Sequence, residues 1–261
     1  MRSNVIIWTA VAAIFGFLFI PVIIILVYAF SAAPIPAWPL HGFALHWFAD
    51  TWNDDEVREA LLLSIEVAAL ATVMAILLGT LAALAVVKMR SASREVVSFV
   101  AVLPIALPGI LTGMALASYF ASWGMNLSYW TIVAGHATFC TVIVYNNVVA
   151  RLRRMPRSLT EASADLGADA FRTFRLVQMP MMGSAIGAGA LLAFALSFDE
   201  VIVTTFTAGA QNTLPLWIFG AIRLGQKLPE VNVVVFAIII FTAIPVLLAQ
   251  RLIGESGRVA R

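Results

Sequence analysis

The chain has 261 residues, of which 62% are hydrophobic and only 11% are charged, and its formal net charge is +2. A soluble domain of this length would carry about a quarter charged residues, so the composition excludes a soluble globular protein. The long uncharged blocks and a mean hydropathy of +0.97 indicate an integral membrane protein instead.

Charge-free blocks predict an all-α integral membrane protein with six transmembrane helices, each near the ~20 residues that cross a bilayer. Backbone polar groups must be satisfied inside lipid, which favours helices at these lengths. The predicted spans are residues 5–30, 67–87, the two parts of 96–150 on either side of a break at 123–126, 176–198 and 231–250. The uncharged block 201–222 is interrupted by glycine, asparagine and proline, and is predicted to end the fifth span and continue as an outer loop.

The outer segment 31–58, between the first two spans, is rich in proline and tryptophan, which suits anchoring in the headgroup region. Residues 50–59 are predicted to start an amphipathic lead-in to the second span. The first apolar block is longer than the 7–15 residues typical of a signal peptide, so cleavage is not expected.

The distribution of lysine and arginine predicts the orientation in the membrane. With six spans both termini lie on one side, and most basic residues fall there: Arg2, Lys88, Arg90, Arg94, Arg151, Arg153, Arg154, Arg157, Arg172, Arg175, Arg251, Arg258 and Arg261. Only Arg58, Arg223 and Lys227 fall on the other side. We therefore expect a multi-pass membrane protein with both termini in the cytoplasm. The basic pI reflects this asymmetry and does not indicate a nucleic-acid partner.

Proline and glycine recur inside the third and fifth predicted spans. Pro104, Pro108 and Gly109 favour a kink in the third span. Gly183 and Gly187 are four residues apart in the fifth, a small-xxx-small spacing that allows helices to approach closely.

No constellation of residues in the sequence indicates catalysis. The chain lacks a Gly-x-x-x-x-Gly-Lys-Ser/Thr phosphate loop, so it is not predicted to hydrolyse ATP by that route. The single cysteine, Cys140, is expected to pack as a small apolar residue. His41, His46 and His136 lie in different segments, so no metal site is predicted.

The cytoplasmic segment between the fourth and fifth spans carries local helix signals. Ser158 and Glu161 have the spacing of a capping box, which predicts a short helix over 159–166. Gly167 suits the left-handed residue that ends a helix, and Asp169 is a predicted N-cap. The second helix should carry three apolar residues on one side: Phe171, Phe174 and Leu176. By these local rules alone, Glu161 only caps a helix and Gly167 only ends it.

The wider pattern of this segment resembles the EAA loop of bacterial ABC importer permeases. The matching positions are Glu161, Ala162, Gly167, Val177, Met179 and Pro180. Ser163, Val177 and Met179 depart mildly from the alanine, isoleucine and leucine usual in the family. The segment also precedes the penultimate span, as in that family. The resemblance extends over roughly spans two to six.

This resemblance implies the type I ABC importer permease (MetI-like) fold and a transport subunit, not an enzyme. The implied regions are a first span with its periplasmic loop (1–56), the permease domain (57–252) and a cytoplasmic tail (253–261). The implied partners are a second permease, two ATPase subunits, a periplasmic solute-binding protein and membrane lipid. No cofactor is implied for this chain, because the partner ATPase uses ATP and Mg²⁺. The residues implied to contact the ATPase are Glu161, Ala162, Asp165, Leu166, Gly167 and Ala168.

The end of the fifth span carries two acids, Asp199 and Glu200, and acids at membrane depth are by default functional. The alternative is that one of them pairs with Arg223 or lies at the water boundary. Glu66 is a further candidate for the substrate path, with pairing inside the helix bundle as its alternative. Trp217 could line the path by cation–π contact, with packing as its alternative.

The residues after this acidic pair are similar to the second permease of spermidine/putrescine-type importers. The order that carries the similarity is Thr204, Thr205, Thr213, Leu214, Pro215, Arg223, Gly225, Pro229, Glu230 and Asn232. Those permeases usually have Leu-Asp-Asp where this chain has Phe198-Asp199-Glu200. The resemblance implies a polyamine substrate, and similar systems carry ferric iron, opines, aminobutyrate or aminophosphonates. A membrane-embedded enzyme, a passive channel and an exporter are the alternatives of other classes.

Overall fold

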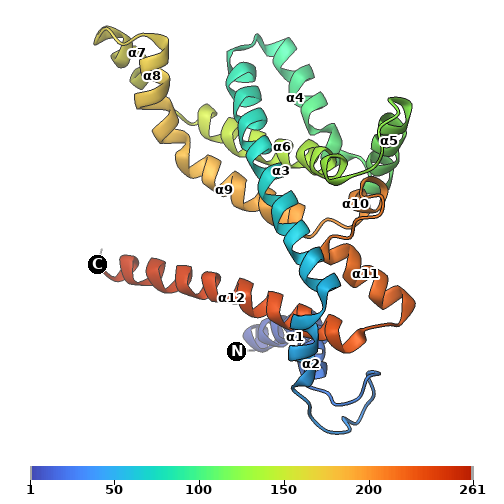
Figure 1. Ribbon diagram of the computed structural model, residues 1–261. Coiled ribbons are helices and arrows are strands. Elements are labelled where there is room, and N and C mark those ends of the chain that lie inside the picture. The colour runs from blue at the N-terminus through green and yellow to red at the C-terminus, as the bar shows by residue number, and fades with distance from the viewer. Residues whose placement is uncertain (1, 260–261) are drawn as a thin grey trace. The chain divides into compact units, whose positions relative to one another are not determined.

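The computed structural model describes the backbone of residues 2–259 and the side chains of residues 6–90 and 93–243. The described chain is helical apart from loops and one isolated antiparallel bridge between Ser31 and Phe43 (Figure 1). It divides into two compact units, one made of residues 59–217 and the other of residues 1–58 together with 218–261.

The larger unit contains the predicted second to fifth spans. Its elements are most of α3 (Asp55–Lys88), α4 (Ser91–Ala106), α5 (Gly109–Ser122), α6 (Tyr129–Arg153), α7 (Arg157–Asp165), α8 (Ala170–Thr173), the π-helical segment η1 (Phe174–Gln178), α9 (Met179–Phe198), α10 (Ile202–Thr207) and the start of α11 (Leu214–Leu224). The order of the elements and the central position of α6 can be followed in Figure 1.

Helix α6 forms the centre of this unit. It is the least apolar of the four helices that qualify as full spans, with a mean hydropathy of 1.4, yet 67% of the 18-residue stretch that defines its span is buried inside the chain. The first helix, α1 (Arg2–Tyr28), has a mean hydropathy of 3.0, and none of the corresponding stretch is buried. A helix surrounded by protein can hold polar side chains that find partners there, whereas a helix that faces lipid must be apolar.

Helices α6 and α9 pack antiparallel over about four turns. Near the end of α6, Arg151 Nε donates a hydrogen bond to Met181 O at the start of α9 (2.8 Å). Near the start of α6, His136 Nδ1 lies 2.8 Å from Ser197 Oγ at the end of α9. Between these two contacts the helices share a buried apolar core with α3 and α10. The α6–α9 interface therefore fixes both ends of α9.

Two glycines allow neighbouring helices to approach this interface closely. A Cβ atom at Gly79 of α3 would lie 2.8 Å from Thr141 O and 2.9 Å from Tyr145 N, both in the α6 backbone. A Cβ atom at Gly189 of α9 would lie 3.2 Å from the Val144 Cα. Backbone atoms cannot move aside as a flexible side chain can, so Gly79 requires the absence of a side chain, whereas a methyl group at Gly189 would need a shift of a few tenths of an ångström.

The close approach that the spacing of Gly183 and Gly187 allows is not found among the described residues, because nothing lies within 4 Å of a Cβ built at either glycine. The same spacing does mark a contact in the third predicted span, where Gly109 and Gly113 both lie against α10, next to Ile202 and Phe206.

The third predicted span is a broken pair of helices. Helices α4 and α5 are bent by 100° at the break between Ala106 and Gly109, where the sequence predicted a kink. The predicted separation from the fourth span at residues 123–126 is confirmed, since α5 ends at Ser122 and α6 begins at Tyr129. Pro108 precedes α5 and has no N–H to extend α4.

Four described helices are long and apolar enough to cross a membrane, and the bent pair would make a fifth. The sixth predicted span, 231–250, lies in α12 (Leu228–Val259), whose side chains are described only as far as residue 243. Block 201–222 is largely helical, forming α10 and most of α11 where an outer loop was predicted. Its interrupting residues lie mainly between these two short helices.

The smaller unit joins the N-terminal and C-terminal parts of the chain. Helix α1 and the short α2 (His46–Asn53) both pack against α12. Three phenylalanines stabilise this contact. The rings of Phe30 and Phe48 each pack edge-on against the ring of Phe236, at centroid distances of 5.2 and 5.6 Å. The predicted lead-in over 50–59 is split between α2 and the start of α3, and Asp54 is the junction.

An ion triad also holds the smaller unit together. Lys227 Nζ lies 2.7 Å from Asp54 Oδ2 and 2.8 Å from Glu56 Oε2. Burial raises the pKa of Asp54, but the hydrogen bond and charge of Lys227 outweigh it, so the net pKa lies below its usual value. The same hydrogen bonds raise the pKa of Lys227. Asp54 and Lys227 are therefore both charged at neutral pH.

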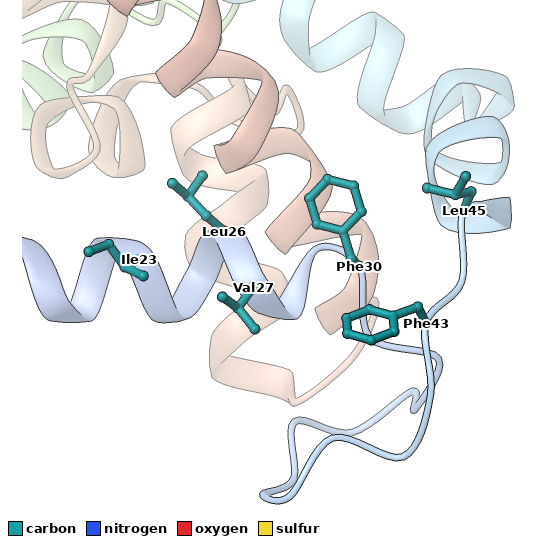
Figure 2. Close-up of a pocket in the computed structure, with 6 residues that line it drawn as sticks. All are labelled: Ile23, Leu26, Val27, Phe30, Phe43 and Leu45. Carbon is teal, nitrogen blue, oxygen red and sulfur yellow. The ribbon is translucent and has the colours of Figure 1, made fainter.

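A pocket beside α1 is lined by apolar side chains only. Figure 2 shows Ile23, Leu26 and Val27 along the helix and three more side chains from the following segment: Phe30, Phe43 and Leu45. The pocket has a volume of about 590 Å³. Such a lining suits the hydrocarbon of a bilayer and offers no group for chemistry.

We expect Gly79→Ala to destabilise the protein. The added methyl group would overlap the α6 backbone, and overpacking costs roughly 1–3 kcal/mol, more than the ~1 kcal/mol that alanine gains in a helix. Gly187→Ala is the matched control, because nothing lies within 4 Å of the added methyl group. Thermal unfolding of the purified protein in detergent would measure both. Equal midpoints for the two variants would contradict the close approach of α3 to α6.

Candidate functional site

The segment between α6 and α9 begins differently from the prediction. Helix α7 starts at Arg157 with Pro156 at its N-cap, so Ser158 lies inside the first turn. The N-cap position has no side-chain hydrogen bond, and the capping box predicted from Ser158 and Glu161 is wrong. Proline before a helix already fixes the local backbone, which moves the start of the helix ahead of the serine.

The end of α7 agrees with the sequence. Gly167 has a φ of +77°, the left-handed conformation predicted for it. The next N–H group, that of Ala168, donates to Ser163 O (3.0 Å), which closes the helix. Asp169 then caps α8, because its side chain accepts a hydrogen bond from Arg172 N (2.7 Å). The end of α7 and the start of α8 are thus both fixed within three residues.

A buried pair of hydroxyl groups joins α7 to α8. Ser163 Oγ and Thr173 Oγ1 lie 3.0 Å apart, and both residues are buried. The two short helices therefore form one small body. This body continues through η1 into α9 without a loop.

The residues predicted to contact an ATPase lie on the surface of this body. Glu161, Ala162, Asp165 and Gly167 are exposed and Ala168 is half-buried. Leu166 is 88% exposed, the largest exposure among the described large apolar residues. An apolar side chain held outward by a fixed turn is typical of a protein contact surface.

The second helix of the segment departs from the prediction. Phe171 and Leu176 are exposed, whereas Phe174 packs against the α6–α9 core. The predicted common face is therefore wrong. The backbone widens to π-helical hydrogen bonding over η1, which changes the angular spacing of side chains on which the prediction depended.

The two predicted acids lie at the opposite end of α9, and they differ. Asp199 is the C-cap of α9, is exposed, and its carboxylate has no hydrogen bond or ion pair with any described residue. Glu200 is half-buried, and its Oε1 accepts a hydrogen bond from Val203 N in the first turn of α10 (2.9 Å). Asp199 is therefore available to a ligand, while Glu200 shapes the corner between α9 and α10, here called the acidic corner.

A buried histidine that is not among the predicted site residues holds the acidic corner in place. His136 is 1% exposed, and its two ring nitrogens lie 2.8 Å from Ser197 Oγ and 2.8 Å from Thr204 Oγ1. Thr204 donates its only hydroxyl proton to Glu200 O (2.6 Å), so His136 Nε2 must donate to Thr204. One side chain of α6 thus holds the residues before and after the acids. Its only sequence signal was a histidine in an otherwise apolar span.

The remaining predicted site residues are spread over the chain. Glu66 is exposed on α3 and interacts electrostatically with Tyr129 at the start of α6. Trp217 is 6% exposed, which favours the packing alternative given for it. Arg223 is exposed on α11 and belongs to the smaller unit, whereas Asp199 and Glu200 belong to the larger one.

Comparison with known proteins places this architecture in a family. Residues 75–254 match the family described as binding-protein-dependent transport system inner membrane component. The chain belongs to this family. Its members are permease subunits of ABC importers in the inner membrane, which work with an ATPase and a solute-binding protein. The chain is therefore a multi-pass transport component and not an enzyme.

Two curated relatives match most of the chain. The putrescine transport system permease protein PotI of Escherichia coli (strain K12) is 33% identical over 86% of this chain and 83% of its own length. The spermidine/putrescine transport system permease protein PotC of the same organism is 31% identical over 91% of this chain and 90% of its own.

Solved structures show the same fold. The chain superposes on a chain of a bacterial ABC transporter involved in the import of the acidic polysaccharide alginate, with a TM-score of 0.66, 18% identity and 98% of each chain covered. An amino acid ABC transporter gives a TM-score of 0.59 at 17% identity, with 80% of this chain and 100% of the other covered. The expected type I permease fold is confirmed.

We expect His136→Leu to destabilise the protein by roughly 1–3 kcal/mol, because Ser197 and Thr204 would each lose a buried hydrogen-bond partner. Thermal unfolding in detergent would measure this loss. His41→Leu, a change at an exposed histidine, is the control and should leave the midpoint unchanged. An unaltered midpoint for His136→Leu would contradict the role of this residue at the acidic corner.

Proposed function

We propose that this chain is one permease of an importer that carries a polyamine cation of the putrescine or spermidine type. The observation that carries the proposal is the match to two polyamine permeases over most of the chain. The unpaired carboxylate of Asp199 adds a physical reason, because a cation that leaves water needs a negative partner along its path.

The acidic corner suits a flexible, multiply charged amine better than an anion. Asp199 offers a free carboxylate, and the carboxylate of Glu200 adds negative charge although one oxygen caps α10. Glu66, exposed on α3 of the same unit, is a third acid. An acidic substrate such as an aminophosphonate would be repelled by these groups.

The α7–α8 body is proposed to dock on the ATPase through Leu166 and the neighbouring coupling residues. Its rigidity comes from the Ser163–Thr173 hydrogen bond and the Asp169 cap. Helix α9 then connects this body to Asp199, about 30 Å away for 20 helical residues. Closure of the ATPases would move α9 and, through the α6–α9 interface, reposition the acidic corner.

The proposed assembly contains this chain, a second and different permease, two ATPase subunits and a periplasmic solute-binding protein. Both termini and the α7–α8 body lie in the cytoplasm, as the basic residues predict. ATP and Mg²⁺ are used by the ATPase, and this chain binds no cofactor.

Cysteine labelling would test the orientation and the docking together. Cys140, the only cysteine, is fully buried, so a cysteine introduced at an exposed site would be the only accessible thiol. In Leu166→Cys we expect a membrane-impermeant maleimide to react only after the cells are opened, and addition of the ATPase to suppress this reaction.

Ile35→Cys is the matched control, because Ile35 is 70% exposed in the predicted outer segment. It should react in intact cells and be indifferent to the ATPase. Reaction of Leu166→Cys in intact cells would overturn the orientation. Reaction that the ATPase does not suppress would overturn the docking assignment.

Uptake of radiolabelled putrescine and spermidine would test the substrate. In Asp199→Asn we expect uptake to fall about tenfold at low substrate concentration, because one attractive charge in the path is lost. Glu59→Gln, which removes an exposed acid at the start of α3, is the control and should transport normally.

The same cells would be offered ferric iron, an opine, aminobutyrate and an aminophosphonate. Uptake of one of these without uptake of a polyamine would refute the polyamine assignment and leave the permease role intact. Equal polyamine uptake by Asp199→Asn and the parent protein would remove Asp199 from the path.

A further inference from the structure

A polar pocket lies between α4 and α6, away from the acidic corner. It has a volume of about 450 Å³ and is lined by Arg94, Glu95 and Ser98 of α4 and by Arg153, the last residue of α6. Nothing in the proposed transport path uses these residues. The pocket lies where both helices reach their basic ends, the level at which a span meets the headgroups.

The charged groups of this pocket face the same space without neutralising one another. Neither guanidinium lies within 4.0 Å of a carboxylate of a described residue, and Glu95 likewise has no ion pair there. Two unpaired arginines beside one unpaired glutamate leave two positive charges and one negative charge to be matched. A ligand that carries both a phosphate and an ammonium group offers a partner for each sign of charge, and the oxygens of one phosphate can accept hydrogen bonds from two guanidinium groups.

A hydroxyl pair completes the phosphate side of the pocket. Ser98 Oγ lies 2.8 Å from the Tyr145 hydroxyl, and Tyr145 is 2% exposed. When Tyr145 donates in this bond, Ser98 keeps its own proton for a phosphate oxygen. The serine is thus held in place by a buried partner on α6.

The surface next to the pocket is apolar. Val96, Phe99 and Val100 are 63%, 68% and 56% exposed, and their spacing places them along one face of α4. An acyl chain can lie on this face while the head occupies the pocket. This continuity favours a lipid over a free phosphate compound.

We infer that the pocket formed by Arg94, Glu95, Ser98 and Arg153 binds the headgroup of a phospholipid with a primary amine, such as phosphatidylethanolamine. The two arginines and Ser98 bind the phosphate, Glu95 accepts a hydrogen bond from the ammonium group, and the acyl chains lie along α4. Basic pockets between transmembrane helices recognise phospholipid heads in this manner. The bound lipid would stabilise the contact between the ends of α4 and α6.

Native mass spectrometry of the full-length purified protein would test this site, with phosphatidylethanolamine, phosphatidylcholine and phosphatidylglycerol added separately. Phosphatidylethanolamine should bind best. The double variant Arg94→Gln/Arg153→Gln should bind it about tenfold more weakly, because two charge-assisted contacts are lost. The control Arg90→Gln/Arg154→Gln removes the same charge from residues that do not line the pocket, and should bind it as the parent protein does.

Glu95→Gln tests recognition of the ammonium group separately from recognition of the phosphate, because it keeps both arginines. It should abolish the preference for phosphatidylethanolamine over phosphatidylcholine, whose quaternary ammonium cannot donate a hydrogen bond. This variant also decides the matter if the double arginine variant does not fold.

Three results would overturn the inference. Equal losses in the two double variants would show general attraction to basic residues. Equal binding of phosphatidylethanolamine and phosphatidylcholine by the parent protein would exclude recognition of the amine. Competition by inorganic phosphate at the same concentration as the lipid would show a phosphate site that needs no acyl chain.

Discussion

The antiparallel contact between α6 and α9 is the interaction on which the larger unit depends. At one end Arg151 bonds the backbone at the start of α9, and at the other His136 bonds Ser197. The apolar core between these bonds admits the close approach of Val144 to Gly189. In a bilayer, lipid tails are as apolar as leucine, so such packing and interhelical hydrogen bonds hold helices together where the hydrophobic effect does not.

This contact is also the physical basis of the coupling that we propose between the two candidate functional regions. The α7–α8 body and the acidic corner lie at opposite ends of α9. The body continues into α9 through η1 without a loop, and the acidic corner is held to α6 by the His136–Ser197 hydrogen bond. A rigid helix between two well-defined ends carries displacement from one to the other.

The sequence predicted those features that rest on local or compositional rules. Uncharged blocks located the helices that cross the bilayer, and Gly167 and Asp169 marked a helix end and a helix start. The failures come from interactions that pattern rules do not contain. A proline ahead of Ser158 set the start of α7, and η1 rotated Phe174 away from Phe171. The role of His136 depends on partners 61 and 68 residues away, which no local spacing reveals.

The π-helical segment η1 has a further consequence for how motion passes along the chain. A π turn holds about one residue more than an α turn, so the segment stores a register offset between Phe174 and Gln178. If these residues changed to α-helical hydrogen bonding, the α7–α8 body would turn by about 100° around the helix axis relative to α9. Leu166 would then point in a different direction while Asp199 stayed where it is. A change of hydrogen bonding in η1 would therefore reorient the short helices relative to α9, because no loop separates them.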